Sequence, residues 1–215
     1  MRLVLIIFSV LIFGLESYAQ DVQADNTLWA SVRLRIVPDD KTTIDIRPIA
    51  RFHDSYSDYR NSSVDYSYTR KLSPLFTVGV LGRTWFLAEG ENGSFGSNRQ
   101  FIWPYLILKK KTGQATFETR FMKHWALDLD GVADRDFFRI KPAINYPLGE
   151  KVNSQLAVEG WYQFDDVDEF ARLRIELSLG YKISDQFSAG LVYRRENDKI
   201  SPDFDMIVAT ITYKI

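Results

Sequence analysis

Apolar and polar side chains alternate along most of this sequence, and this alternation limits the fold more than any other feature. The clearest stretch is residues 171–181. Its odd positions are apolar, and its even positions as far as residue 178 are charged or polar: Ala171, Leu173, Ile175, Leu177, Leu179 and Tyr181 against Arg172, Arg174, Glu176 and Ser178. Successive side chains of a β-strand point to opposite faces, so the stretch predicts a strand with one apolar and one charged face. Such a strand needs a different environment on each side.

Strand-like segments fill the rest of the chain, and no window of comparable length has helical spacing. Besides 171–181 they are 28–37, 44–52, 63–70, 75–87, 99–109, 114–122, 135–146, 155–164, 187–196 and 204–215. Short connections alternate with longer ones, as the periplasmic turns and external loops of outer-membrane barrels do. We therefore expect an all-β fold, an antiparallel up-and-down transmembrane β-barrel of about 10–12 strands. Because single-chain bacterial barrels have an even number of strands, we expect one segment to lie outside the wall or one strand to be missed.

The first residues predict export. Met1 and Arg2 form a short basic start, residues 3–13 are an apolar run, and Ser17-Tyr18-Ala19 is a small-x-small cleavage pattern. The apolar run is shorter than the roughly 20 residues that a membrane-spanning helix needs. We expect residues 1–19 to be a cleaved signal peptide and residues 20–215 to form one barrel domain in the cell outer membrane.

The polar faces of the strands carry arginine far more often than lysine. Arginine is favoured for confined ion pairs because its planar fork binds carboxylates bidentately, whereas the lysines gather at turns such as 109–111. We therefore expect the charged faces to point into the lumen and the apolar faces to meet lipid. Strand parity assigns a lumen charge network to Arg33, Arg35, Asp45, Arg47, Glu118, Arg120, Arg135, Arg139, Glu159, Arg172, Arg174 and Glu176, with Arg51, Asp65, Arg83, Lys141, Arg194 and Glu196 on the same faces.

Two states of this lumen are consistent with the sequence. Long Arg and Glu side chains can fill a narrow barrel, and this predicts a plugging network in which Arg174 pairs with carboxylates such as Glu159. In an open, water-filled lumen, the excess of arginine over carboxylate would instead favour a small anion. We expect the plug, with the anion-preferring pore as the alternative.

Aromatic residues are numerous, with 11 Tyr, 15 Phe and 5 Trp. Girdles at the two membrane interfaces would use many of them, and we expect His124, beside Trp125, to lie at such an interface. Two segments, 75–87 and 99–109, are apolar on both faces over much of their length, so their Trp85, Trp103 and Tyr105 are expected inside.

Several motifs resemble those of a known family. They are the opening Leu28-Trp29, the strands Phe117-Glu118-Thr119-Arg120-Phe121 and Arg172-Leu173-Arg174-Ile175-Glu176, and the hairpin from Gly180-Tyr181-Lys182 to Tyr193-Arg194. Together they resemble the outer-membrane β-barrels grouped as domain of unknown function 2490. The terminal strand also resembles the assembly signal of such barrels, although it ends on Ile215 where an aromatic residue is usual. The resemblance implies a fold, a location among outer-membrane lipids and handling by the barrel-assembly machinery, and it implies no activity.

Enzymatic and metal chemistry have little support. His53-Asp54-Ser55 resembles the His-x-Ser pattern of lipid A deacylases, with Asp45 or Asp65 to orient the imidazole, but the motif is very short and begins an apparent loop. The chain has no cysteine and no His pair, and the acidic stretches at 128–131 and 165–169 are typical of solvated turns, so we expect no metal site and no cofactor. A net charge of -1 without a basic tail argues against a nucleic-acid partner.

The sequence therefore predicts an outer-membrane barrel with a structural or narrow-channel role and no catalysis. A lipid-processing enzyme of the deacylase type and a soluble periplasmic ligand-binding barrel remain as alternatives. The second would place its apolar faces inside and its charged faces in water.

Overall fold

The computed structural model describes residues 25–53, 58–89, 94–127, 137–164, 169–198 and 204–215. Within them no helix is long and apolar enough to cross a membrane. These residues form eleven strands: β1 (Asp25–Ile36), β2 (Thr42–His53), β3 (Asp58–Lys71), β4 (Phe76–Glu89), β5 (Ser94–Thr112), β6 (Ala115–Leu127), β7 (Phe137–Pro147), β8 (Val152–Gln163), β9 (Glu169–Lys182), β10 (Phe187–Asp198) and β11 (Phe204–Lys214).

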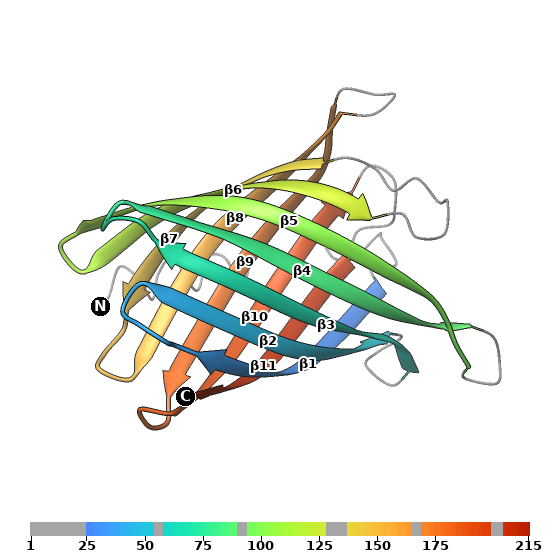
Figure 1. Ribbon diagram of the computed structural model, residues 1–215, viewed down its shortest axis with the longest axis horizontal. Helices are drawn as coiled ribbons and strands as arrows, with labels where there is room; N and C mark the ends of the chain where they lie inside the picture. Colours follow the sequence, from blue (N-terminus) through green and yellow to red (C-terminus); the bar gives the residue numbers. More distant parts are fainter. Residues whose placement is uncertain (1–24, 54–57, 90–93, 128–136, 165–168, 199–203) are drawn as a thin grey trace, which may run out of the picture.

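The strands close into a single barrel in which each pairs with its neighbours in sequence (Figure 1). Every consecutive pair is antiparallel, and β1 closes the barrel against β11 in parallel, from Asp25 opposite Phe204 to Arg35 opposite Lys214. The predicted all-β up-and-down barrel is confirmed, and each of the eleven expected segments supplies a strand of the wall. The expectation of an even number was wrong, because a parallel closing pair lets an odd number of strands form a ring.

The two ends of the barrel differ in their connections (Figure 1). At one end, the turn end, adjacent strands are joined by residues 37–41, 72–75, 113–114, 148–151 and 183–186. Gly113, in the tightest of these turns, has a φ of 58°, which glycine adopts without strain. In the first turn the Lys41 amide donates to Asp39 Oδ1 at 2.8 Å, and this bond lowers the pKa of the Asp39 carboxyl. The connections at the opposite end, the loop end, include segments outside the described residues.

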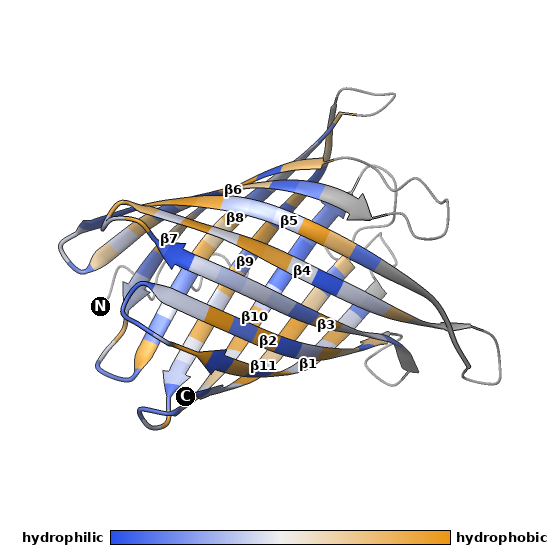
Figure 2. Ribbon diagram, in the orientation of Figure 1, coloured by the Kyte–Doolittle hydropathy of each residue, from blue (hydrophilic) through white to orange (hydrophobic). Residues whose placement is uncertain are grey.

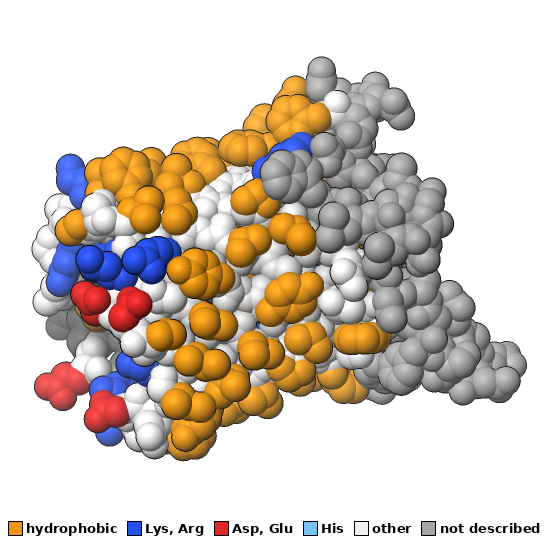
Figure 3. Space-filling view, viewed as in Figure 1, with side chains coloured by type: hydrophobic (Ala, Val, Ile, Leu, Met, Phe, Trp, Pro, Cys, Tyr) orange, Lys and Arg blue, Asp and Glu red, His pale blue; other side chains and the backbone are white. Residues whose placement is uncertain are grey.

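Hydrophobic and hydrophilic residues alternate along the strands (Figure 2), and hydrophobic side chains cover much of the outer surface of the wall in the view of Figure 3. Large apolar side chains such as Val32, Leu173 and Ile175 are exposed there, and charged groups gather at the turn end in the view of Figure 3. Near that end the strands expose a ring of aromatic side chains: Tyr68, Phe76, Phe117, Tyr146, Tyr181 and Phe187. Tyrosine and phenylalanine form this girdle, whereas Trp29, Trp85, Trp103 and Trp161 all line the interior.

One residue on β9 points the opposite way from its prediction. Ala171 was expected on the outer face, but it is only 2% exposed and packs against Phe137 and Trp161. The cause is a β-bulge, because Trp161 pairs with Arg172 while the next residue of β8 pairs with Phe170. Phe170 is therefore turned outward, 61% exposed, and Ala171 inward.

A glycine on β4 makes room for an inward tyrosine on β5. Gly79 lies opposite Tyr105, and a Cβ at Gly79 would overlap the tyrosine ring and lie 2.6 Å from the backbone oxygen of Tyr68. The Tyr105 hydroxyl also forms a hydrogen bond with the Thr69 hydroxyl, which holds the ring in this place. The absence of a side chain at Gly79 therefore sets the position of Tyr105 in the interior.

Replacing this glycine should destabilise the barrel. We expect Gly79→Ala to lower the free energy of unfolding by about 1–3 kcal/mol, because the new methyl group overpacks the wall. Gly190→Ala is the matched control, since a Cβ there would meet only backbone oxygens at 3.9 and 4.0 Å, and it should be close to neutral. Urea titrations of both variants in lipid vesicles measure the difference. Equal midpoints for the two variants would contradict the packing described here.

Candidate functional site

A cavity of about 800 Å³ lies inside the barrel and is lined by inward side chains from all eleven described strands. Ten cationic side chains and six carboxylates line it, an excess of four positive charges. The cations are Arg33, Arg35, Arg47, Arg83, Arg120, Arg139, Lys141, Arg172, Arg174 and Arg194, and the carboxylates are Asp45, Asp65, Glu118, Glu159, Glu176 and Glu196.

The structure brings together eleven of the twelve residues assigned to the lumen network from the sequence. Arg33, Arg35, Asp45, Arg47, Glu118, Arg120, Arg139, Glu159, Arg172, Arg174 and Glu176 all line the cavity. Arg135 lies outside the described residues. The alternation of polar and apolar residues predicted these positions, because every second residue of a strand faces the same way.

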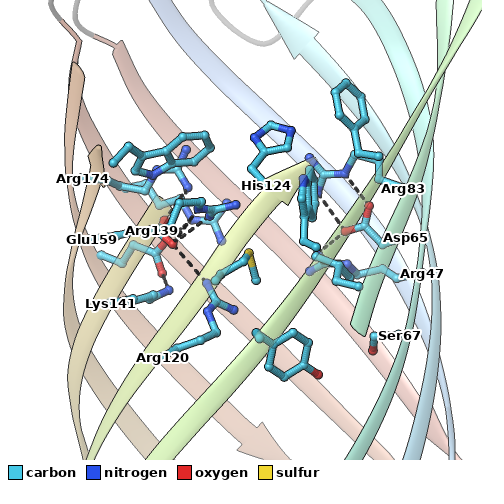
Figure 4. Close-up of a pocket in the computed structure, with 18 of the residues that line it drawn as sticks. Arg47, Asp65, Ser67, Arg83, Arg120, His124, Arg139, Lys141, Glu159 and Arg174 are labelled. Carbon is cyan, nitrogen blue, oxygen red and sulfur yellow. Dashed lines mark hydrogen bonds and ion pairs between the residues drawn. The ribbon is translucent and has the colours of Figure 1, made fainter. Parts of the chain in front are cut away.

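Glu159 on β8 is the centre of the largest ion-pair cluster (Figure 4). Its carboxylate accepts bonds from Arg139 at 2.7 Å, from Arg174 at 3.1 Å and from Arg120 at 3.2 Å. The Glu159 side chain is only 1% exposed. Three guanidinium groups therefore replace the water that this carboxylate loses on burial.

Two further glutamates extend the cluster across β9 and β10. Glu176 pairs with Lys141 and, at 2.9 Å, with Arg194. Glu196 pairs with Arg174 and, at 3.0 Å, with Arg172. Arg174 thus bridges Glu159 and Glu196 and also lies 3.9 Å from Glu176. The six cations and three glutamates of β6–β10 therefore form one connected set, which we call the glutamate cluster.

A second, smaller cluster lies on β1–β4 and is centred on aspartates. Asp65 accepts bonds from Arg47 at 2.6 Å and from Arg83 at 2.6 and 2.9 Å. Asp45 accepts two bonds from Arg35, at 2.8 and 2.9 Å. Figure 4 shows the Asp65 group and the Glu159 group on opposite sides of the interior.

Arg33 differs from these arginines. It lines the cavity, and its main electrostatic neighbours are Arg47, Asp45, Arg35 and Asp65. Within the described part of the chain, however, no carboxylate forms an ion pair with its guanidinium. Arg33 is therefore a spare cation beside the aspartate cluster.

The ion pairs run along the wall and leave a cavity inside the barrel. The lumen ion pairs between described strands join adjacent strands, as Arg139 to Glu159 does, or strands one further apart, as Arg120 to Glu159 and Lys141 to Glu176 do. Among the described residues none connects the aspartate cluster with the glutamate cluster across the lumen. The expected pairing of Arg174 with Glu159 is present, and a cavity lies between the two clusters. The plug stays a prediction, because a cavity inside the barrel is not a path from one end to the other.

Aromatic rings line the loop-end half of the cavity. His124 was expected at a membrane interface but lies inside, with its ring centroid 5.0 Å from that of Trp103 and 5.7 Å from that of Phe137. Arg139 stacks over Trp161 at 3.9 Å, and Arg51 lies between Trp29 and Trp85 at 4.3 and 4.6 Å from their centroids. The alternation of strand faces could have predicted that His124 and Trp161 lie inside, since each is two or four residues from a lumen charge on its own strand.

A family described as "Protein of unknown function (DUF2490)" matches residues 26–205, from the start of β1 into β11. The chain belongs to the DUF2490 family. A search of curated proteins found no match. The family description names no activity, so the chemistry of the interior carries the argument about function.

The motifs considered for catalysis and metal binding lie largely outside the described residues of this DUF2490 barrel. Asp54 and Ser55 of the deacylase-like motif lie outside the described residues, as do the acidic stretches 128–131 and 165–168. The two carboxylates considered as orienting groups, Asp45 and Asp65, are both engaged by arginine. No group of three or more His, Cys, Asp or Glu that could hold a metal occurs among the described residues.

The two kinds of lumen arginine should differ in their effect on stability. We expect Arg174→Gln to cost the DUF2490 barrel about 3–5 kcal/mol, because it leaves Glu159 and Glu196 buried with fewer cationic partners. Arg33→Gln removes a charge that pairs with no described carboxylate, so its unfolding midpoint in urea should stay close to that of the wild type. If both variants shifted the midpoint equally, the division into structural and spare cations would be refuted.

Proposed function

We propose that this DUF2490 protein is an outer-membrane β-barrel with a narrow lumen that attracts anions, and that it is not an enzyme. The single observation that carries the proposal is the cavity wall, on which ten cations face six carboxylates. Confined positive charge favours the entry of anions over cations. The proposal keeps the narrow-channel role and sets aside the plug.

Membrane insertion is supported by the direction of the strand faces. Exposed Val32, Leu173 and Ile175 alternate with inward Arg33, Arg172, Arg174 and Glu176, and an aromatic ring lies near the turn end. Apolar outside, polar inside and aromatic girdles are the marks of membrane barrels. A soluble ligand-binding barrel would need the reverse, because exposed apolar area of this extent is costly in water.

Export and orientation follow from the sequence within the same proposal. Residues 1–19 act as a cleaved signal peptide, and residues 20–215 are the mature barrel. Short turns face the periplasm in such barrels, so the turn end is the periplasmic end. Outer-membrane lipid and, during biogenesis, the barrel-assembly machinery are the partners that this placement implies.

The pH-independent charge of arginine allows a direct test of the lumen. In planar bilayers the wild type should pass chloride in preference to potassium, seen as a shifted reversal potential in a salt gradient. Arg33→Gln should move this potential toward zero, because it removes one of the four excess charges without breaking an ion pair.

Arg195→Gln is the matched control, since Arg195 does not line the cavity and pairs with Asp205 at 4.0 Å. It should leave the reversal potential unchanged. A wild type that carries no current, or one that prefers potassium, would overturn the proposed anion-attracting lumen.

A further inference from the structure

The wall of the cavity is divided between charged and apolar sectors. Leu81 on β4, Trp103 and Ile107 on β5 and Met122 on β6 form an apolar strip that faces the cavity. Phe101, Trp103 and Met122 are buried and pack together, with Leu81 and Tyr105 against them. This strip lies between the aspartate cluster and the glutamate cluster. Trp103 and Met122 form its buried base, and Leu81, Tyr105 and Ile107 are partly exposed toward the cavity.

Cations with unused donors lie on both sides of that strip. Arg33 has no carboxylate partner among the described residues, and Arg120 makes a single 3.2 Å bond to Glu159. A guanidinium has five N–H donors, so both retain most of theirs. Tyr105, at the edge of the apolar strip, lies within electrostatic range of Arg120 on one side and of Arg35 and Asp45 on the other.

The charge excess and the apolar strip constrain the ligand in different ways. An inorganic anion would satisfy the spare cations but would make no use of the partly exposed side chains of Leu81, Tyr105 and Ile107. Small-molecule sites are mostly apolar cavities of roughly 300–1,000 Å³ with a few polar groups that fix orientation, and this cavity of about 800 Å³ has that size and that division. An anion with an apolar body would use both sectors.

We propose that the cavity binds an amphipathic organic anion, with its carboxylate on Arg33 and an aromatic or branched apolar body against Leu81, Tyr105 and Ile107. This inference rests on the proposed anion-attracting lumen and adds the class of ligand. Charge-assisted hydrogen bonds hold the carboxylate, and apolar burial selects organic anions over inorganic ones. The aromatic ring of Tyr105 favours a planar body.

Calorimetric titration of the barrel in lipid nanodiscs tests this inference, with 2-naphthoate as the probe and empty nanodiscs to subtract partition into lipid. We expect 2-naphthoate to bind at least about tenfold more tightly than inorganic phosphate and than the neutral 2-naphthalenemethanol. Arg33→Gln should weaken the binding of 2-naphthoate about tenfold, since one charge-assisted contact is lost. Arg195→Gln, outside the cavity, should not change it.

A second variant separates the apolar sector from the charges. Ile107→Ser should weaken 2-naphthoate and leave phosphate unaffected, and each variant is checked for folding by its heat-dependent migration on gels. If phosphate binds as well as 2-naphthoate and both depend on Arg33, the inference fails while the anion-attracting lumen stands. If neither anion binds and the bilayer shows no anion preference, the proposed function fails with it.

Discussion

Three buried glutamates and the six cations around them determine how this barrel can be filled. A carboxylate moved from water into a confined interior loses hydration worth several kcal/mol, and only close cationic donors restore it. Arg174 forms ion pairs with two of the three glutamates, Glu159 and Glu196. Lys141 and Arg194 form ion pairs with the third, Glu176. Because these contacts join side chains on strands next to each other or one further apart, they also fix the register of β6–β10. The polar face of each strand is thereby committed to the interior, and the apolar face is left to the outside.

The remaining cations give the interior a second property. In the aspartate cluster, Arg35 forms an ion pair with Asp45, and Arg47 and Arg83 both form ion pairs with Asp65. Arg33 lies beside both groups and has no carboxylate partner among the described residues. Charge that the protein does not neutralise must be neutralised by water or by anions from outside. Under the proposed function, the stability of the barrel and its attraction for anions depend on different arginines of one wall.

Most of the fold could be predicted from the sequence because strand periodicity is a local property. Alternate residues of a strand face inward and outward, and this rule correctly predicted that Arg174, Glu176 and the other described network residues line the cavity. Features that depend on long-range pairing escaped it. Parallel closure of β1 on β11 involves residues at opposite ends of the chain, and the bulge that turns Ala171 inward is set by its pairing with β8. The cavity was not predicted either, because composition counts charges but does not show that Asp65 and Glu159 lie on opposite sides of the interior.

Cysteine accessibility tests the central claim, a water-filled cationic interior inside an apolar exterior, most directly, because the chain contains no cysteine of its own. Ser67 lines the cavity, whereas Val32 is 57% exposed on the outer face. In proteoliposomes, Ser67→Cys should react with a negatively charged, water-soluble methanethiosulfonate, and faster than with its positively charged counterpart. Val32→Cys should react with neither and only with a lipid-soluble maleimide. Rapid labelling of Val32→Cys by the charged reagents, with Ser67→Cys protected, would contradict the account.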